Sequence, residues 1–372
     1  MQQFLQEVHG QKRVKESLNN IFLSKKIPQS MLFVGPEGVG KYFTAIQFIK
    51  LINSTDNELL NEINYKRISS IAEPYLKLIY PLPRGKNEAD DNSFQGLSDI
   101  QLNDVKEQIR KKKVNPYHKI SITGAESIKI SSIREINQFT SLMFDDLNYR
   151  LIAIIDAHLM STESQNALLK NLEEPPEGII FILFTTDDNL LLSTIRSRCW
   201  KVQFEPLNDE DLLLILEKYY SFNKEEIDKI KYFGNGSVQN TIFLLENDLN
   251  SIINKTINIL RYSFAGWYSS ALAEFKDILK NSDYDLMRII IKLIFTWINN
   301  LIKFRNNEVN NCYKLFLDSI SKFNSKFYNV NFDEVIVRID TLNQYLDKNV
   351  NLNIVAVNII LELSMVTINE KV

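Results

Sequence analysis

The strongest chemical pattern in the chain is a glycine-rich loop between an apolar run and a helical segment. Residues Gly35 to Lys41 read GPEGVGK, which fits the phosphate-binding pattern G-x-x-x-x-G-K. Glycines such as Gly35, Gly38 and Gly40 let backbone N–H groups curl around phosphate oxygens, and a lysine reaches the terminal phosphates. We therefore predict a nucleotide site at Gly35, Gly38, Gly40 and Lys41. The alternative is a tight turn that kept its shape and lost its ligand.

The groups that complete such a site are changed or missing. A working loop continues with Ser or Thr, whose hydroxyl binds Mg²⁺, whereas this chain has Tyr42, and Thr44 is out of register. Asp156 ends the run LIAIID and is a further candidate for the nucleotide site, since a carboxylate there holds Mg²⁺ through water. The next residue, Ala157, has no basic side chain, and His158 comes one position late. We predict a degenerate site with impaired hydrolysis and no metal site.

Composition indicates a multidomain protein without a global charge signal. The 372 residues suggest two or three domains. The net charge of −3 excludes a positive field over the whole molecule, so DNA contact needs a local patch. The two cysteines, Cys199 and Cys312, form neither a disulfide framework nor a zinc pattern, which predicts a reducing cytoplasm and no zinc. No signal peptide or membrane span is evident, so we expect no membrane association.

Periodicity places the elements around these residues. Strands are expected at 31–34, 75–80, 118–124, 151–156, 178–186 and 198–204, and helices at 4–24, 42–52, 99–113, 131–143 and 161–176. Strands that alternate with helices predict a parallel sheet. Ser132 and Glu135 have the spacing of a capping box at the start of their helix. After Pro206 helical periodicity continues to the end, and we expect a separate helical domain from about residue 248.

One stretch interrupts this pattern. Residues from about 82 to 116 are expected to form an insertion, with a polar, turn-rich part and then the helix over 99–113. This helix ends in a basic run from Arg110 to Lys113. Because basic residues in a last turn complement the helix dipole, we favour that role over nucleic-acid binding.

Three motifs resemble one branch of a known superfamily. NALLKNLEEPP from Asn166 to Pro176, TIRSRC from Thr194 to Cys199, and an N-terminal VHGQ together resemble the clamp-loader branch of AAA+ proteins. The resemblance covers roughly residues 1 to 245. It implies an α/β P-loop AAA+ parallel-sheet domain at 1–206 with the insertion at about 82–116, a small helical lid at 207–247, and an all-α collar or oligomerisation domain at 248–372.

The departures from the family pattern all point in one direction. The ATPase subunits of the gamma/tau kind carry Ser or Thr, Glu and Arg where this chain has Tyr42, Ala157 and Gln239, and they carry zinc-binding cysteines that are missing here between Lys41 and Asp156. The chain is more similar to the delta-prime subunits of bacterial DNA polymerase III clamp loaders. That resemblance implies gamma/tau and delta subunits as partners, the beta sliding clamp and primed DNA reached through the complex, and a cytoplasmic location.

The same resemblance implies roles for individual residues. Arg198 of the SRC motif is expected to act as an arginine finger at a neighbour's ATP, with an ordinary surface or interface salt bridge as the alternative. Arg196 is the weaker candidate for the finger. Ser131, Ser132 and Arg134, at the start of a helix, are candidates for contact with the DNA backbone, with a plain N-cap as the alternative. Binding of ATP or ADP without hydrolysis stays open. An active gamma/tau-type ATPase and a non-replicative AAA+ adaptor are the alternative functions.

Overall fold

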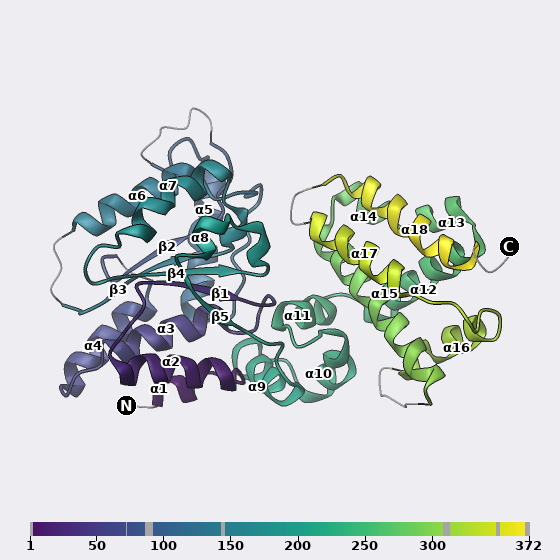
Figure 1. The fold of residues 1–372 in the computed structure, drawn as a ribbon, viewed down its shortest axis with the longest axis horizontal. Helices are drawn as coiled ribbons and strands as arrows, with labels where there is room; N and C mark the ends of the chain where they lie inside the picture. Colours follow the sequence, from purple (N-terminus) through teal and green to yellow (C-terminus); the bar gives the residue numbers. More distant parts are fainter. Residues whose placement is uncertain are drawn as a thin grey trace. The chain divides into compact units, whose positions relative to one another are not determined.

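The chain folds into two compact units, as seen in a computed structural model (Figure 1). The structure describes residues 3–71, 73–85, 92–142, 146–307, 313–346 and 350–368. The first unit comprises Met1–Ile227 with Asn235–Gln239, and the second comprises Asp228–Gly234 with Asn240–Val372. This division into two does not test the predicted boundaries at 206 and 247, so the sheet, lid and collar domains stay predictions.

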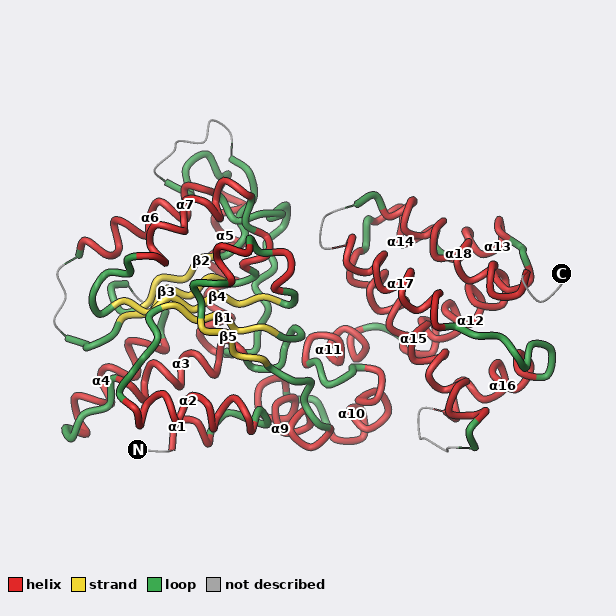
Figure 2. Tube along the Cα trace, viewed as in Figure 1, coloured by secondary structure: helices red, strands yellow, loops and turns green. Residues whose placement is uncertain are grey.

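The first unit is built on a parallel sheet of five strands in the order β2-β3-β4-β1-β5 (Figure 2). The strands are β1 (Ser30–Val34), β2 (Leu76–Ile79), β3 (Arg150–Ile154), β4 (Ile179–Thr185) and β5 (Trp200–Gln203). Each pairing is parallel, with Leu32 opposite Leu183 and Ile152 opposite Phe181. The three central strands are buried along their whole length, as expected for a sheet covered on both faces.

Helices cover both faces of this sheet (Figure 1). One face carries α6 (Ile130–Ser141) and α7 (Thr162–Glu173), whose Ile133, Phe139 and Leu168 are buried in the same core as the strands. The other face carries α2 (Lys12–Ser24), α3 (Lys41–Ile52) and α4 (Glu58–Ser69). The remaining elements up to residue 230 are α1 (Gln3–Gln6), α5 (Asp99–Val114), the 3₁₀ turns η1 (Ala157–Leu159) and η2 (Asp188–Leu190), α8 (Ser193–Arg196), α9 (Asp209–Tyr220) and α10 (Lys224–Ile230).

The described part of the second unit consists of helices and loops (Figure 2). Its core forms around α15 (Tyr284–Arg305), where Trp297 packs edge-on against Phe323 with ring centroids 5.3 Å apart. Phe264 stands 4.6 Å from the same Phe323 ring. The other elements after residue 230 are η3 (Lys231–Phe233), α11 (Val238–Glu246), α12 (Leu249–Ala265), α13 (Tyr268–Glu274), α14 (Lys276–Asn281), α16 (Tyr313–Asn324), α17 (Asp333–Tyr345) and α18 (Leu352–Ile368).

The predicted fold class is confirmed: a parallel α/β sheet with a phosphate loop, followed by a helical C-terminal region. Within the described residues, no helix is both long enough and apolar enough to cross a membrane. In that same part of the chain, His, Cys, Asp and Glu side chains do not gather into a set of three that would hold a metal ion. Cys312 lies outside the described residues.

Three local predictions were wrong. The helix expected over 4–24 is divided into α1 and α2, because Gly10 and Gln11 adopt left-handed backbone conformations with φ of 64° and 51°. The strand expected over 118–124 is a loop, in which Ile120 and Ile122 alternate because they pack with Val105 in a small satellite cluster. The alternation therefore reflects packing and not strand pairing.

The predicted capping box of Ser132 and Glu135 is also absent. The helix begins earlier, at Ile130 with Lys129 at the N-cap position, so that Ser132 lies inside the first turn. The Glu135 carboxylate instead accepts hydrogen bonds from Lys77 Nζ at 2.9 Å and from the Ser93 backbone N–H at 2.8 Å. This carboxylate ties α6 to β2 and to the loop that follows β2.

Candidate nucleotide site

The phosphate loop has the predicted position between β1 and α3. Gly40 is the N-cap residue of α3 and, like Gly38, has a left-handed backbone with φ of 91° and 71°, respectively, which favours glycine. Lys41 begins the helix and donates from Nζ to the carbonyl oxygens of Gly35 and, at 2.6 Å, of Pro36. The structure thus brings the four predicted loop residues together.

Asp156 faces the same small cavity as the phosphate loop. Its backbone is left-handed, with φ of 52°, directly after the last residues of β3. Burial disfavours the charged ammonium of Lys41 and lowers the pKa of Lys41 to about 8, although the carboxylates of Asp156 and Glu37 oppose this change. The neighbouring Ala157 is buried and offers no polar side-chain group.

Tyr42 stands where a metal-binding hydroxyl would be expected, and it is buried against a lysine from another element. Lys112, near the end of α5, lies with Nζ 4.4 Å from the centroid of the Tyr42 ring. The same Nζ donates to the carbonyl oxygens of Pro116 at 2.8 Å and His118 at 2.6 Å. Burial and the nearby Lys41 lower the pKa of Lys112 to about 7, against the opposing pull of Asp156. Burial also raises the pKa of Tyr42, so its phenol stays protonated.

Tyr117 covers the phosphate loop from the side of the insertion. Its side chain is only 4% exposed and packs against Phe43 and Tyr219, with centroid separations of 5.6 and 5.3 Å. Its ring edge would lie 3.3 Å from a Cβ placed on Gly40. Its hydroxyl is buried and makes no hydrogen bond to any described residue. The aromatic ring therefore occupies the space directly next to the loop.

Gln239 covers the second loop glycine. Its carboxamide oxygen stands so close to Gly38 that a Cβ on Gly38 would collide with it. Its amide group donates to the carbonyl oxygen of Tyr117 at 2.6 Å. Lys119 forms an ion pair of 3.1 Å with Glu37 in the phosphate loop. Gln239 and the segment around Tyr117 thus close over the loop together.

These side chains decide whether a nucleotide fits. The cavity that remains between the loop, Asp156 and the insertion has a volume of about 80 Å³. Pockets that bind nucleotide-sized ligands generally enclose roughly 300 to 1,000 Å³. The residues present therefore do not fit a nucleoside triphosphate with its metal ion in this conformation.

A hydroxyl at the end of β4 is engaged elsewhere. The Thr185 hydroxyl donates to the carbonyl oxygen of Asp187 at 2.8 Å and lies 3.2 Å from Nδ1 of His158. The adjacent Phe184 lines the cavity with its apolar ring. The end of β4 thus presents an aromatic ring to the site, while its hydroxyl holds the following turn.

Arg198 lies in the short link between α8 and β5. Its Nη2 forms an ion pair of 2.6 Å with the Glu173 carboxylate at the end of α7, and its Nη1 donates to the carbonyl oxygen of Thr194 at 2.9 Å. Its side chain remains 34% exposed. Arg196 differs, because its Nη1 contacts the Asn189 side chain at 3.3 Å and its Nε is buried without a hydrogen-bond partner among the described residues.

The three DNA candidates differ in accessibility. Ser131 and Ser132 are buried, with exposed fractions of 6% and 4%, whereas Arg134 on the same helix is exposed. Only the arginine therefore presents its side chain at the surface of α6. DNA contact by Ser131, Ser132 and Arg134 stays a prediction.

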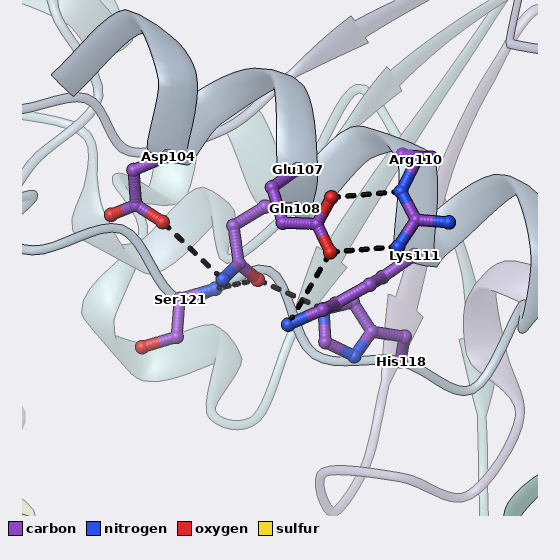
Figure 3. Close-up of polar contacts among 7 residues, drawn as sticks. All are labelled: Asp104, Glu107, Gln108, Arg110, Lys111, His118 and Ser121. Carbon is purple, nitrogen blue, oxygen red and sulfur yellow. Dashed lines mark hydrogen bonds and ion pairs between the residues drawn. The ribbon is translucent and has the colours of Figure 1, made fainter. Parts of the chain in front are cut away.

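The basic run at the end of α5 is not a uniform patch (Figure 3). Arg110 donates to both carboxylate oxygens of Glu107 at 2.7 and 2.8 Å, and Lys111 lies 3.8 Å from the same carboxylate. Lys112 turns inward to the site. The sequence did not single out Lys112 or Tyr117 as site residues, because the basic run was assigned to the helix dipole. The one signal in the sequence was the presence of this basic run in a chain whose phosphate loop has Tyr42 in place of the metal-binding Ser or Thr.

The chain is similar in sequence to known subunits of DNA polymerase III. A family model described as "DNA polymerase III, delta subunit" matches residues 10–208. DNA polymerase III subunit tau of Bacillus subtilis is 26% identical over 253 residues, which is 67% of this chain and 38% of that protein. Subunit gamma of one Buchnera aphidicola is 36% identical over 149 residues, or 38% of this chain and 40% of that protein.

A further gamma subunit, from the Buchnera aphidicola of Baizongia pistaciae, is 24% identical over 357 residues and covers 93% of this chain and 85% of its own length. By contrast, the chain spans only 38% of the length of the Bacillus subtilis tau subunit and 40% of the length of the first Buchnera aphidicola gamma subunit. A solved gamma-subunit-related protein of Thermotoga maritima has a TM-score of 0.39 at 13% identity, with 94% of this chain and 99% of that chain covered, and is too distant to decide the fold.

Proposed function

We propose, because this chain belongs to the DNA polymerase III delta-subunit family, that it is the delta-prime-type subunit of a bacterial clamp loader. In this role it helps to load the sliding clamp onto primed DNA during replication. Its own nucleotide site is silent, and it supplies Arg198 to the ATP of a neighbouring subunit. The observation that carries the proposal is the contrast between a phosphate loop filled from within and a retained arginine that is partly exposed.

Three changed residues support a silent site. Tyr42 offers a buried phenol in place of a metal-binding hydroxyl, and Ala157 offers no group to polarise water. Gln239 has no positive charge and already contacts Gly38 and Tyr117. Each substitution removes one interaction that stabilises a transferring phosphoryl group.

Arg198 supports catalysis in trans. A guanidinium at a neighbour's γ-phosphate stabilises the developing charge and accelerates hydrolysis by roughly 10³ to 10⁵. The exchange of a solvent-exposed ion pair for a contact with phosphate costs little free energy, because such pairs stabilise a protein by only about 0 to 1 kcal/mol. The contact with Glu173 therefore holds Arg198 without locking it.

The partners follow from the same assignment. They are the gamma/tau and delta subunits, with the beta clamp and primed DNA reached through the assembled complex, and the location is the bacterial cytoplasm. Within the DNA-facing surface Arg134, with Ser131 and Ser132 at its helix start, is the proposed contact with the DNA backbone.

A second candidate is an active ATPase of the gamma/tau kind. It is favoured by the names of the relatives, which are tau and gamma subunits, one of them matching over 93% of this chain. ATP turnover by the purified chain separates the two candidates, because the delta-prime-type subunit is inert alone. No specific observation favours a non-replicative adaptor.

The finger is tested in the reconstituted clamp loader with Arg198→Ala. We expect hydrolysis at the neighbouring site to fall by roughly 10³ or more, so that the complex loses that share of its DNA-stimulated ATPase and loads clamps more slowly. Arg198→Lys should be nearly as defective, since lysine keeps the charge but lacks the planar fork. Arg110→Ala, which removes an exposed arginine paired with Glu107, is the matched control. Unchanged turnover and loading with Arg198→Ala would overturn the proposal.

A further inference from the structure

The end of the insertion lies inside the phosphate-loop site. We propose that the segment Lys112–Ile120 is an internal occupant of this site, with the Lys112 side-chain nitrogen in the place of a metal ion and Tyr117 in the place of a nucleotide. This inference rests on the proposed silent site and explains what keeps that site silent. It gives the insertion a role, which is to exclude nucleoside phosphates.

The metal position is occupied by a basic group of the chain itself, the side-chain nitrogen of Lys112. In a working loop the cation lies between the residue after the loop lysine and the acidic residue that follows another strand of the sheet. These positions are Tyr42 and Asp156, and the Lys112 ammonium lies over the Tyr42 ring and is attracted by the Asp156 carboxylate. An aromatic face is a good partner for an ammonium ion and a poor ligand for Mg²⁺. The change to Tyr42 and the placement of Lys112 are therefore complementary.

The phosphate position is covered by uncharged groups. Tyr117 packs against Gly40, and the Gln239 carboxamide lies against Gly38. The bond of 2.6 Å from Gln239 to the Tyr117 carbonyl oxygen joins the two covers. A phosphate that entered the loop would have to displace both groups at once.

Several contacts hold the occupant in place. Figure 3 shows Gln108 of α5, whose side-chain oxygen lies 2.8 Å from Nε2 of His118 and accepts from the backbone N–H of Ser121 at 3.3 Å. Asp104, one turn earlier, accepts from the backbone N–H of Thr123 at 3.0 Å. Lys119 ties the other side of the segment to the phosphate loop through Glu37. The segment is thus fixed at both of its flanks and by its buried aromatic ring.

The experiment measures nucleotide binding by the full-length chain before and after the occupant is opened. Fluorescent ADP and ATP, each with and without Mg²⁺, are titrated with the wild-type chain and with the double variant Tyr117→Ala, Gln239→Ala. We expect no saturable binding to the wild type and an affinity at least about tenfold higher for the double variant. Tyr75→Ala, which truncates a buried tyrosine away from the cavity and from the segment Lys112–Ile120, is the matched control and should bind no better than the wild type.

Each outcome decides the inference. A folded double variant that still fails to bind overturns it, because the segment would then not be what excludes the ligand. Binding by the wild type without turnover overturns the internal occupant but leaves the silent site, whereas binding with turnover overturns both. If the double variant does not fold, hydrogen exchange of the wild-type amides in 36–42 and 112–120 decides. Unchanged exchange with Mg-ADP supports the inference, and added protection overturns it.

Discussion

At the residue scale, the buried lysines of the site leave a measurable mark on stability. Lys112 has a folded-state pKa of about 7, well below its value of 10.5 in an unfolded chain. Between these two pH values the unfolded chain binds a proton that the folded chain has lost, so stability rises as the pH rises. The cost of burying the charged form is fully present below about pH 7. Lys41, with a pKa of about 8, contributes with the same sign.

Replacement of the ammonium should flatten this dependence. In Lys112→Met the free energy of unfolding should rise less steeply between about pH 7 and 9, by up to about 1.4 kcal/mol per pH unit. Chemical denaturation of both proteins at several pH values measures the two slopes. Lys113→Met, which changes an exposed neighbour, should leave the wild-type slope intact. Equal slopes in Lys112→Met and the wild type would show that the buried ammonium is not titrating in this range.

The pH range of this experiment ends near pH 9, because above that value the Cys199 thiol changes the stability in the opposite direction. Burial raises the pKa of the Cys199 thiol from 9.0 to about 12. Above about pH 9 the unfolded chain therefore loses a proton from this thiol that the folded chain keeps, and the contribution of Cys199 to stability falls. Measurements between pH 7 and 9 isolate the lysines.

At the element scale, α6 combines a buried face with an exposed arginine. Ile133, Ile136 and Phe139 face the core, and the Arg134 side chain lies on the surface. If α6 follows the DNA backbone, Arg134→Ala should lower the slope of log K against log salt by about 1 for DNA binding by the assembled complex. Arg13→Ala, in the exposed part of α2, should leave the slope unchanged. An unaltered slope with Arg134→Ala would remove this helix from the DNA surface.

The individual elements also show how much of the structure could be predicted from the sequence. The strand–loop–helix of the phosphate site was predictable because its signals lie within about 20 consecutive residues. Helix α7 and Arg198 were found through local motifs. Lys112 and Tyr117 were not found, because their meaning comes from contacts with Tyr42 and Gly40, some 70 residues away in sequence. The strand expected over 118–124 is a loop for a related reason, since its alternation records packing of Ile120 and Ile122 against Val105 of the preceding helix α5.

At the scale of the whole molecule, the second unit presents an apolar helix surface. In α18 the buried side includes Ile359 and Leu363, while Ile354, Val357, Leu361 and Met365 are exposed by 57%, 42%, 40% and 45%. Their spacing of three or four residues forms one stripe along the helix. An exposed apolar stripe of this kind is typical of a surface that other chains cover. This agrees with the proposed collar role of residues 248–372.

A charge within this stripe should weaken assembly and leave the chain folded. Leu361→Lys places an ammonium where a partner would exclude water, so we expect association with the other clamp-loader subunits to weaken by at least about tenfold. Sedimentation of the mixed subunits measures the change, with circular dichroism as the check on folding. Ser321→Lys adds the same charge at an exposed polar position of α16, outside this stripe, and should assemble normally. Normal assembly of Leu361→Lys would exclude the stripe from the interfaces.

Because the proposed occupant Lys112–Ile120 is part of the chain, its occupancy of the site would not depend on the concentrations of ATP and ADP in the cell. A tethered ligand acts at an effective concentration that the chain length sets, and dilution or metabolism does not change it. Free ATP or ADP would compete here with an occupant whose effective concentration is constant. Under this proposal, a clamp loader built with this chain would contain one member whose site does not respond to the ratio of ATP to ADP.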